Sequence, residues 1–281
     1  MGASTGFDMD PSVYETGVGN EIDHHRKWLC GKPCGYEGPT HGWFKYEKET
    51  KLKGEPLEPH RSRLCRVIAR YGGARRVRLV LDHGAGPFTN LGRRFNCDFE
   101  GAPRSVRGLD AQVIAVDPLA PLYHGLLNEF EVHDTLRTAY CPSEQLVRCL
   151  GENIVDLSII INALDHSRNA LKAWEQAVRV TRVGGLACVF SMKNEATRMA
   201  NQGFHQWDFT IDANGAWLVT NSLSKASSNV DTLFAGVLLP LDLAQAQVTD
   251  VDEAQFLKCY RKLAHPNATW HVGSRVSGDV T

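Results

Sequence analysis

The sequence has 281 residues, of which 43% are hydrophobic and 22% charged, and these proportions are ordinary for a globular protein. Its formal net charge of -1 gives no electrostatic footprint for DNA or RNA, so we expect no nucleic-acid partner. No stretch approaches the ~20 consecutive apolar residues that a membrane helix needs, so we expect no membrane partner either.

The eight cysteines are scattered along the chain, and the N-terminal residues lack the basic region and apolar run of a secretory signal. We therefore expect a cytoplasmic protein with reduced thiols. Cys30 and Cys34, with His24, His25 and His41 nearby, leave a zinc site open as an alternative. No second cysteine pair stands at comparable spacing, so a turn is the favoured interpretation and no metal is predicted.

Residues 1–75 are predicted to form an N-terminal cap of helices and loops. Their pattern indicates an irregular start over residues 1 to ~20, a short helix over 21–29, a loop over 30–55 and a helix over 57–71. Gly72 and Gly73 should end that last helix.

The pattern changes at the start of a second predicted domain, residues 76–281. Short apolar runs predict buried strands at 77–81, 113–116, 154–161 and 186–190, and a helical stripe lies between the last two, at 169–182. This alternation is typical of an α/β fold in which helices cover both faces of a mostly parallel sheet. Further along, we expect strands at 216–220 and 232–239 as a closing pair, and an amphipathic helix over 252–264.

A glycine-rich turn follows the first of these strands. Asp82 ends the strand, and Gly84 and Gly86 let the backbone approach a ligand without a Cβ in the way. A nucleotide-phosphate site would need a third glycine where Thr89 stands, and no P-loop lysine follows. The motif instead suits a ligand with a cationic amino-acid end, and we expect the amides of a following helix to face it.

Two further positions fall at the same predicted edge of the sheet, beyond the carboxyl ends of the strands. Asp117 ends the second strand and could accept both hydroxyls of a ribose, although a turn aspartate before Pro118 is the alternative. The interval from Gly86 is long, and residues ~92–110 look like an insertion between a helix and this strand. Asn162 follows the third strand.

Taken together and in this order, these motifs resemble the class I S-adenosylmethionine-dependent methyltransferase family, over about residues 77–192. The turn at 179–185 looks like the family's glycine-glycine turn, whereas His83 is unusual for it. The resemblance implies a Rossmann-like, doubly wound sheet of seven strands with S-adenosylmethionine as cofactor. It implies a cofactor site made of Asp82, Gly84, Ala85, Gly86, Asp117, Leu119, Ser143, Glu144 and Asn162.

A narrower resemblance concerns the acceptor. The segments 162–166, 193–196 and 205–207 look like those of small stand-alone methyltransferases that we associate with polysaccharide or other small-molecule tailoring. This resemblance implies O-methylation of a small-molecule or glycan acceptor, and it leaves a homo-oligomer open.

Methyl transfer to an alcohol benefits from a base, which typically contributes ~10²–10⁴-fold to the rate. Histidine titrates near neutrality, and we expect His205 to be this base, with His166 second and Asp165 or Asp208 orienting the imidazole. Trp207 is expected to stack on a sugar, with packing as its alternative, and His25 to reach the acceptor from the cap. A metal-assisted reaction stays open, but the acidic residues near the edge (Asp165, Glu195, Asp208) are spread out, so no metal is predicted.

Three other functions stay open from the sequence. A nucleic-acid or protein methyltransferase is the first alternative, although residues 162–165 lack the prolines common in DNA amino-methyltransferases. A methyltransferase-like subunit without catalysis, acting as a binding partner, is the second. An NAD-dependent dehydrogenase is the third, and the missing third glycine disfavours it.

Overall fold

The computed structural model describes residues 9–31, 42–72, 76–248, 251 and 253–264. Its helices are α1 (Pro11–Cys30), α2 (Gly42–Leu52), α3 (Glu58–Val67), α4 (Ala120–Glu129), α5 (Leu146–Leu150), α6 (Ala170–Val180), α7 (Glu195–Arg198) and α8 (Val230–Leu233). The strands are β1 (Leu79–His83), β2 (Arg94–Asn96), β3 (Asp110–Asp117), β4 (Ala139–Tyr140), β5 (Val155–Ile161), β6 (Thr181–Met192), β7 (Trp207–Ile211), β8 (Trp217–Asn221), β9 (Ser227–Asn229), β10 (Leu238–Pro240) and β11 (Gln255–Lys262). Short turns of helix lie between them, and two of these are named below as η2 and η6.

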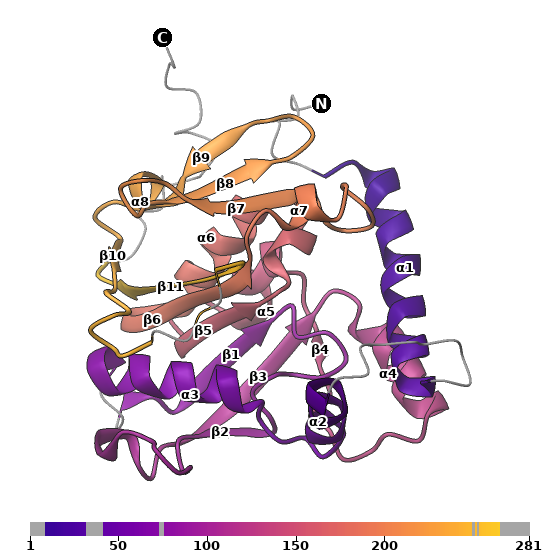
Figure 1. The fold of residues 1–281 in the computed structure, drawn as a ribbon, viewed down its shortest axis with the longest axis horizontal. Coiled ribbons are helices and arrows are strands. Elements are labelled where there is room, and N and C mark those ends of the chain that lie inside the picture. The colour runs from indigo at the N-terminus through magenta and orange to yellow at the C-terminus, as the bar shows by residue number, and fades with distance from the viewer. Residues whose placement is uncertain (1–8, 32–41, 73–75, 249–250, 252, 265–281) are drawn as a thin grey trace.

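A mixed sheet with mostly parallel strands forms the centre of the molecule (Figure 1). In the described part of the chain it has eight strands in the order β10-β11-β6-β5-β1-β3-β2, with β4 also paired to β3. Strands β4, β3, β1, β5 and β6 run parallel, while β2, β11 and β10 each pair antiparallel with their neighbours. This confirms the predicted α/β class. The sheet has one strand more than the seven expected because the short β2 lies beside the start of β3.

Both faces of the sheet are covered, each by a different part of the chain. On one face α6 buries Leu171, Trp174, Ala177 and Val178, the stripe predicted from the sequence. Asn169 begins this helix by accepting a hydrogen bond from the Lys172 amide at 2.9 Å. On the other face the cover consists of α3, the following turn η2 (Ile68–Gly72) and residues 91–109.

The connection from β1 to β3 contains no α-helix, so the expected helix after the glycine-rich turn is wrong. Pro87 lacks an amide hydrogen, and Gly92 has φ +73°, a conformation outside the helical region. The backbone at Gly92 also approaches Pro56 so closely that a Cβ would lie 2.7 Å from the Pro56 nitrogen. The segment therefore crosses the sheet edge as turns and the short β2, and α3, which precedes β1, covers the face instead.

The N-terminal region is more helical than expected. Helix α1 begins at Pro11, where the Asp10 carboxylate accepts a hydrogen bond from the Ser12 amide at 2.8 Å, and it runs without interruption to Cys30. The irregular start predicted up to residue ~20 is therefore wrong from residue 11 on. The predicted loop over 30–55 is wrong at 42–52, which form α2. Residues 1–8 and 32–41, including Cys34 and His41, lie outside the described residues.

The C-terminal elements also differ from their prediction. Residues 255–262 form β11 rather than a helix, because seven of them pair antiparallel with β6 in the middle of the sheet. The expected strand at 216–220 exists as β8, but it belongs to a separate three-stranded sheet, β7-β8-β9. The run at 232–239 divides into the end of α8 and the start of β10, so the two do not form a closing pair.

Disulfides join cysteines at sequence separations from 8 to 71 residues, so the expectation of reduced thiols is wrong. The pairs are Cys65–Cys97, Cys141–Cys149 and Cys188–Cys259, and Cys30 is disulfide-bonded as well. Cys188 and Cys259 are register partners on β6 and β11, a proximity that only the strand pairing creates. Among the described residues, none of the helices combines the length and apolar character that a bilayer crossing requires.

Candidate functional site

A cavity of about 700 Å³ lies at the carboxyl ends of β1, β3, β4 and β5, on the side covered by α1. Its volume falls in the ordinary range of small-molecule sites. In Figure 1, α1 is the long helix at one side of the molecule, running from the three-stranded sheet to α4. The cavity is lined from the sheet edge by Gly84, Ala85, Gly86, Asp117, Leu119, Ser143, Glu144 and Asn162, and from the helices by Tyr14, Glu21, His25, Lys51 and His60, among others.

Asp117 stands at the centre of this lining with its carboxylate fixed by the backbone. Oδ1 accepts a hydrogen bond from the Leu119 amide at 2.8 Å and Oδ2 accepts one from the Gly86 amide at 3.0 Å. Burial raises the pKa of Asp117 to about 6, although these two amides act in the opposite direction. Each oxygen keeps a lone pair, so the carboxylate can still accept hydroxyl donors from a ligand.

Both glycines of the turn have a positive φ, and Gly84, at φ +72°, meets a steric requirement as well. At Gly84 a Cβ would lie 2.5 Å from the Cβ of Ala163, so a glycine is needed there to bring the ends of β1 and β5 together. Gly86 has φ +62°, and its requirement is conformational. The amides of Gly84 and Ala85 both donate to the carbonyl of Val116, at 2.9 and 3.2 Å. The amides of residues 84–86 therefore fasten the turn to β3 and Asp117 instead of facing the cavity.

Below the turn, β1 buries two polar side chains with unused hydrogen-bonding atoms. Asp82 accepts a hydrogen bond from the Thr89 hydroxyl at 2.6 Å, while its Oδ1 has no partner in the described chain, and burial raises its pKa to about 6. His83 Nδ1 lies 3.2 Å from the Ser143 hydroxyl, and burial lowers the pKa of His83 to about 3. His83 is therefore a neutral imidazole that joins β1 to the segment at 143, an unexpected role for the unusual residue of the motif.

The part of the expected cofactor site that contains Ser143 and Glu144 is formed after β4. Ser143 and Glu144 line the cavity, and Glu144 accepts a hydrogen bond from the Asn169 amide at 3.2 Å. Tyr140 also lines the cavity and is 62% exposed, which leaves its ring available to a ligand. On the far side, Asn162 has φ +49° and donates its amide to the Phe190 carbonyl at 2.8 Å.

Helix α1 contributes a carboxylate and an imidazole to the cavity. His25 Nε2 lies 3.0 Å from Glu21 Oε1, and both residues line the space above Gly86. Burial acts to raise the pKa of Glu21, but the His25 hydrogen bond and the nearby His166 outweigh it and lower that pKa to about 2. Glu21 is thus ionised. Trp28 lies three residues after His25 on the same helix. It packs on Phe88 and does not line the cavity.

The three predicted catalytic residues meet behind one wall of the cavity. His205 Nδ1 lies 2.6 Å from Asp165 Oδ2, and His166 Nε2 lies 3.5 Å from the same oxygen. Burial acts to lower the pKa of His205, but the hydrogen bond to Asp165 and the Asp165 charge raise it above its usual value. His166 lines the cavity, whereas His205 and Asp165 do not. The residue nearest an acceptor is therefore His166, not His205.

Trp207 and Asp208 lie away from the cavity, contrary to their predicted contact with the acceptor. Trp207 is fully buried and donates its indole N–H to the Ser167 carbonyl at 2.7 Å, which is the packing alternative. Asp208 accepts hydrogen bonds from the amide and hydroxyl of Thr197, at 2.9 and 2.5 Å. Trp207 packs into the core between the two sheets, whereas Asp208, the next residue of β7, points to the opposite face, toward α7.

Several lining residues were not foreseen, among them Tyr14, Lys51, His60, Arg168 and Phe204. Lys51 lies in a segment predicted as a loop, and Tyr14 in one predicted as irregular, so neither had a predicted face. The guanidinium of Arg168 stacks over the Tyr14 ring at 4.0 Å. Its position two residues after His166 was the one usable signal, because residues following a strand end face the ligand edge.

Comparisons with known proteins find no matching model of a protein family and no match among curated proteins. Among solved structures, the chain is similar to a 1,6-didemethyltoxoflavin-N1-methyltransferase from Burkholderia thailandensis, at 15% identity over 91% of this chain and 92% of that one, with a TM-score of 0.42. It is similar to an O-methyltransferase family protein from Burkholderia thailandensis at 12% identity, over 72% and 55% of the chains, with a TM-score of 0.39. It is also similar to a CurJ carbon methyltransferase, at 11% identity over 67% of this chain and 49% of that one, with a TM-score of 0.41. At these values the site has to be judged by its own geometry.

Proposed function

We propose that the protein is an S-adenosylmethionine-dependent methyltransferase. The observation that carries this proposal is the Asp117 carboxylate, fixed beside the Gly86 turn in the floor of a cavity that continues to Glu144 on one side and Asn162 on the other. A ribose on Asp117 would place an adenine toward Ser143 and Glu144 and the sulfonium amino-acid end toward the turn and Asn162. A pyrophosphate is disfavoured, because the amides of residues 84–86 are already bonded to β3 and Asp117.

The acceptor we propose is a hydroxyl group of a small molecule or a sugar, entering beside His166. Methyl transfer is an in-line displacement: the acceptor oxygen forms a bond to the methyl carbon as the carbon–sulfur bond breaks and S-adenosylhomocysteine leaves. Most of the acceleration comes from alignment within the cavity. The hydroxyl proton goes to an imidazole, for which His166 is placed best because it lines the cavity, with Asp165 and His205 behind it.

Titration calorimetry with S-adenosylmethionine, S-adenosylhomocysteine and NAD tests the cofactor. We expect one S-adenosyl ligand per chain with micromolar affinity and no heat with NAD. Binding of NAD alone would replace this proposal by a dehydrogenase. Absence of heat with all three ligands, together with no thermal shift, would contradict it altogether.

The acceptor and the base are tested by turnover with a panel of sugar and phenolic hydroxyl compounds, the products being identified by mass spectrometry. We expect His166→Gln to lower kcat by about 10²-fold or more with unchanged cofactor affinity, and His205→Gln to lower it less. Cofactor binding without methylation of any acceptor in the panel, or of nucleic acid and protein added as further acceptors, would favour a binding subunit. Full activity of His166→Gln would remove the proposed base.

A further inference from the structure

Asp165, His166 and His205 bring one carboxylate and two imidazoles together from separate parts of the chain. Each offers one ligand atom, and these three atoms lie within 4.8 Å of one another. Asp165 and His166 belong to the turn η6 (Leu164–His166) directly after β5, while His205 precedes β7. The sequence analysis expected Asp165 beside a histidine, but its prediction of no metal weighed the acidic residues alone and did not consider this set.

The three side chains are held in place before any ligand arrives. The Gln206 amide donates to the Asp165 carbonyl at 3.4 Å, which joins the two segments through their backbones. The rings of His166 and His205 meet edge to face with centroids 4.7 Å apart. Asp165 is buried, whereas the two histidines keep about a quarter of their side chains exposed. An ion could therefore reach His166 from the cavity and contact the exposed part of His205 while the carboxylate stays fixed.

The surroundings of the cluster carry negative charge. Asp165, Glu195 and Glu21 all act electrostatically on His205. Glu195 Oε2 is buried and accepts no hydrogen bond from the residues that the structure describes, although Arg198 lies 3.7 Å from it. Because Asp165 has two further acidic residues nearby, Glu195 and Glu21, the electrostatic energy favours a cation at this position.

We propose that Asp165, His166 and His205 bind a divalent transition-metal ion of the zinc type. Two imidazoles and one carboxylate are a ligand set that such ions take. Ligand atoms about 2.0–2.2 Å from a tetrahedral ion stand roughly 3.3 Å apart. The separation of 3.5 Å between Asp165 and His166 already fits. The 2.6 Å contact between Asp165 and His205 has to open by less than 1 Å, and the proton of this hydrogen bond passes to water as the ion binds. The remaining pair, His166 and His205, has its ligand atoms within 4.8 Å and adjusts by a similar movement.

The role of the ion rests on the proposed function, whereas its binding does not. Three protein ligands leave a fourth position open, and His166 puts that position beside the cavity where the acceptor would enter. A hydroxyl bound to the ion loses its proton more readily, and the proton passes to water. In the metal-loaded protein the imidazoles are then ligands, and the ion takes over the activation that a free His166 provides without it.

The test uses the full chain, treated with a chelator and then titrated with Co²⁺ and Zn²⁺. We expect one ion per chain, a visible Co²⁺ absorption band of the four-coordinate type, and its displacement by Zn²⁺. Asp165→Asn, His166→Gln and His205→Gln should each weaken binding at least tenfold, while the exposed control His133→Gln binds normally. No band in the wild-type protein, or equal binding by the cluster variants, would overturn the proposal.

Cofactor calorimetry on the same chelated protein separates the two proposals. If the protein binds S-adenosylmethionine but no metal ion at the cluster, the methyltransferase proposal stands and the metal site is rejected. If an ion binds at the cluster but S-adenosylmethionine does not bind, the metal site stands and the methyltransferase proposal is rejected. If both bind, turnover that falls on chelation and returns with Zn²⁺ or Co²⁺ supports activation by the ion, and turnover indifferent to chelation contradicts that role.

Discussion

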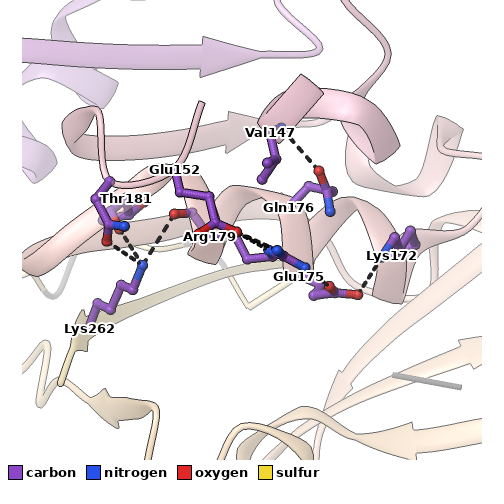
Figure 2. A network of polar contacts seen from close by, with 9 residues as sticks. Val147, Glu152, Lys172, Glu175, Gln176, Arg179, Thr181 and Lys262 are labelled. Carbon is purple, nitrogen blue, oxygen red and sulfur yellow. Dashed lines mark hydrogen bonds and ion pairs between the residues drawn. The ribbon is translucent and has the colours of Figure 1, made fainter. Parts of the chain in front are cut away.

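Two groups of buried polar side chains lie at different places on the same sheet, and they differ in how fully their atoms are paired. Between α6 and β11, Lys262 is fully buried, and its ammonium donates to Asn153 Oδ1, the Arg179 carbonyl and the Thr181 carbonyl at 2.9, 3.2 and 2.6 Å (Figure 2). Glu175, also fully buried, is paired with Lys172 at 2.8 Å and Arg179 at 3.3 Å. Each of these charges has its partners within the protein.

At the carboxyl edge the pairing is incomplete. Asp82 Oδ1 and His83 Nε2 are buried without partners in the described chain, and Asp117 is bonded only by backbone amides that leave lone pairs free. Leaving buried polar atoms unpaired costs stability, so they persist where a ligand or water completes them. Unpaired atoms do not mark a site by themselves, because Trp174 Nε1 on α6 and the Tyr260 hydroxyl on β11 also lack partners in the described chain. What distinguishes the carboxyl edge is Asp117, whose buried carboxylate lines the cavity and is held by backbone amides instead of a charged side chain.

The largest expected effect on stability concerns Lys262→Met. This change keeps the apolar stem but removes the ammonium that donates to three oxygens, one of these hydrogen bonds buried and two part-buried. We therefore expect the free energy of unfolding to fall by about 2–4 kcal/mol. Urea denaturation at pH 7 measures it. Lys172→Met, which removes a half-exposed lysine from the same network, is the control and should cost much less. A loss below about 1 kcal/mol for Lys262→Met would contradict the structural role of this network.

Asp117→Ala should act on the cofactor instead. We expect the affinity for S-adenosylmethionine to fall by about 10²-fold or more, because a ribose would lose its carboxylate acceptor. Calorimetry measures this, and circular dichroism checks that the fold persists. Asp110→Ala, at the exposed opposite end of the same strand, is the matched control and should bind normally. Equal affinity of the Asp117 variant and the wild type would reject the assignment.

Asp82→Asn should stabilise the protein, in contrast to the network variants. The pKa of Asp82 is raised from 3.8 to about 6 by burial, so the folded state keeps this proton longer than the unfolded state does. Stability from this group is complete below pH ~4 and is lost as the pH rises through 6. An asparagine carries no charge, so above pH 6 we expect a gain of about 1–3 kcal/mol. Thermal melts at pH 4.5 and 7.5 test this, and a gain equal at both values would contradict it.

The smallest effect is expected at the surface. Arg26 and Glu129 form an ion pair between α1 and α4, and both side chains are nearly half exposed. Solvent screening limits such pairs, so Arg26→Ala should change the free energy of unfolding by no more than about 1 kcal/mol. A double-mutant cycle with Glu129→Ala measures the coupling. A value several times larger would mean that α1 is attached to the rest of the molecule mainly by charge.

The sequence predicted best where a local pattern determines the structure. The strand ending at Asp82, the strand ending at Asp117 and the helix carrying Trp174 all follow from runs of apolar residues. The end of the chain could not be assigned in this way. Residues 255–262 are compatible with a helical period, and they form a strand because they pair with the edge of β6.

For the site, the residues at the ends of the strands were predicted because sheet topology brings them to one edge. Their partners could not be predicted, since Glu21 and Lys51 come from helices whose packing depends on the whole fold. The contact between Asp165 and His205 was anticipated as a carboxylate–histidine pair. The sequence did not predict that His166 faces the cavity in place of His205, because this depends on the direction of each side chain. The pairing of Cys188 with Cys259 escaped prediction for the same reason as β11, because it depends on the contact of that strand with β6.

The missing helix between β1 and β3 has a consequence for how the chain can be divided. Because α3 and η2 come before β1 and cover the face that a helix after β1 would otherwise cover, a chain shortened to begin at residue 76 would expose Val80, Leu157 and Leu186 to water. It would also lose the bond from Cys65 to Cys97. Such a fragment should aggregate rather than fold, so α3 and η2 belong to the folding unit as much as the sheet does.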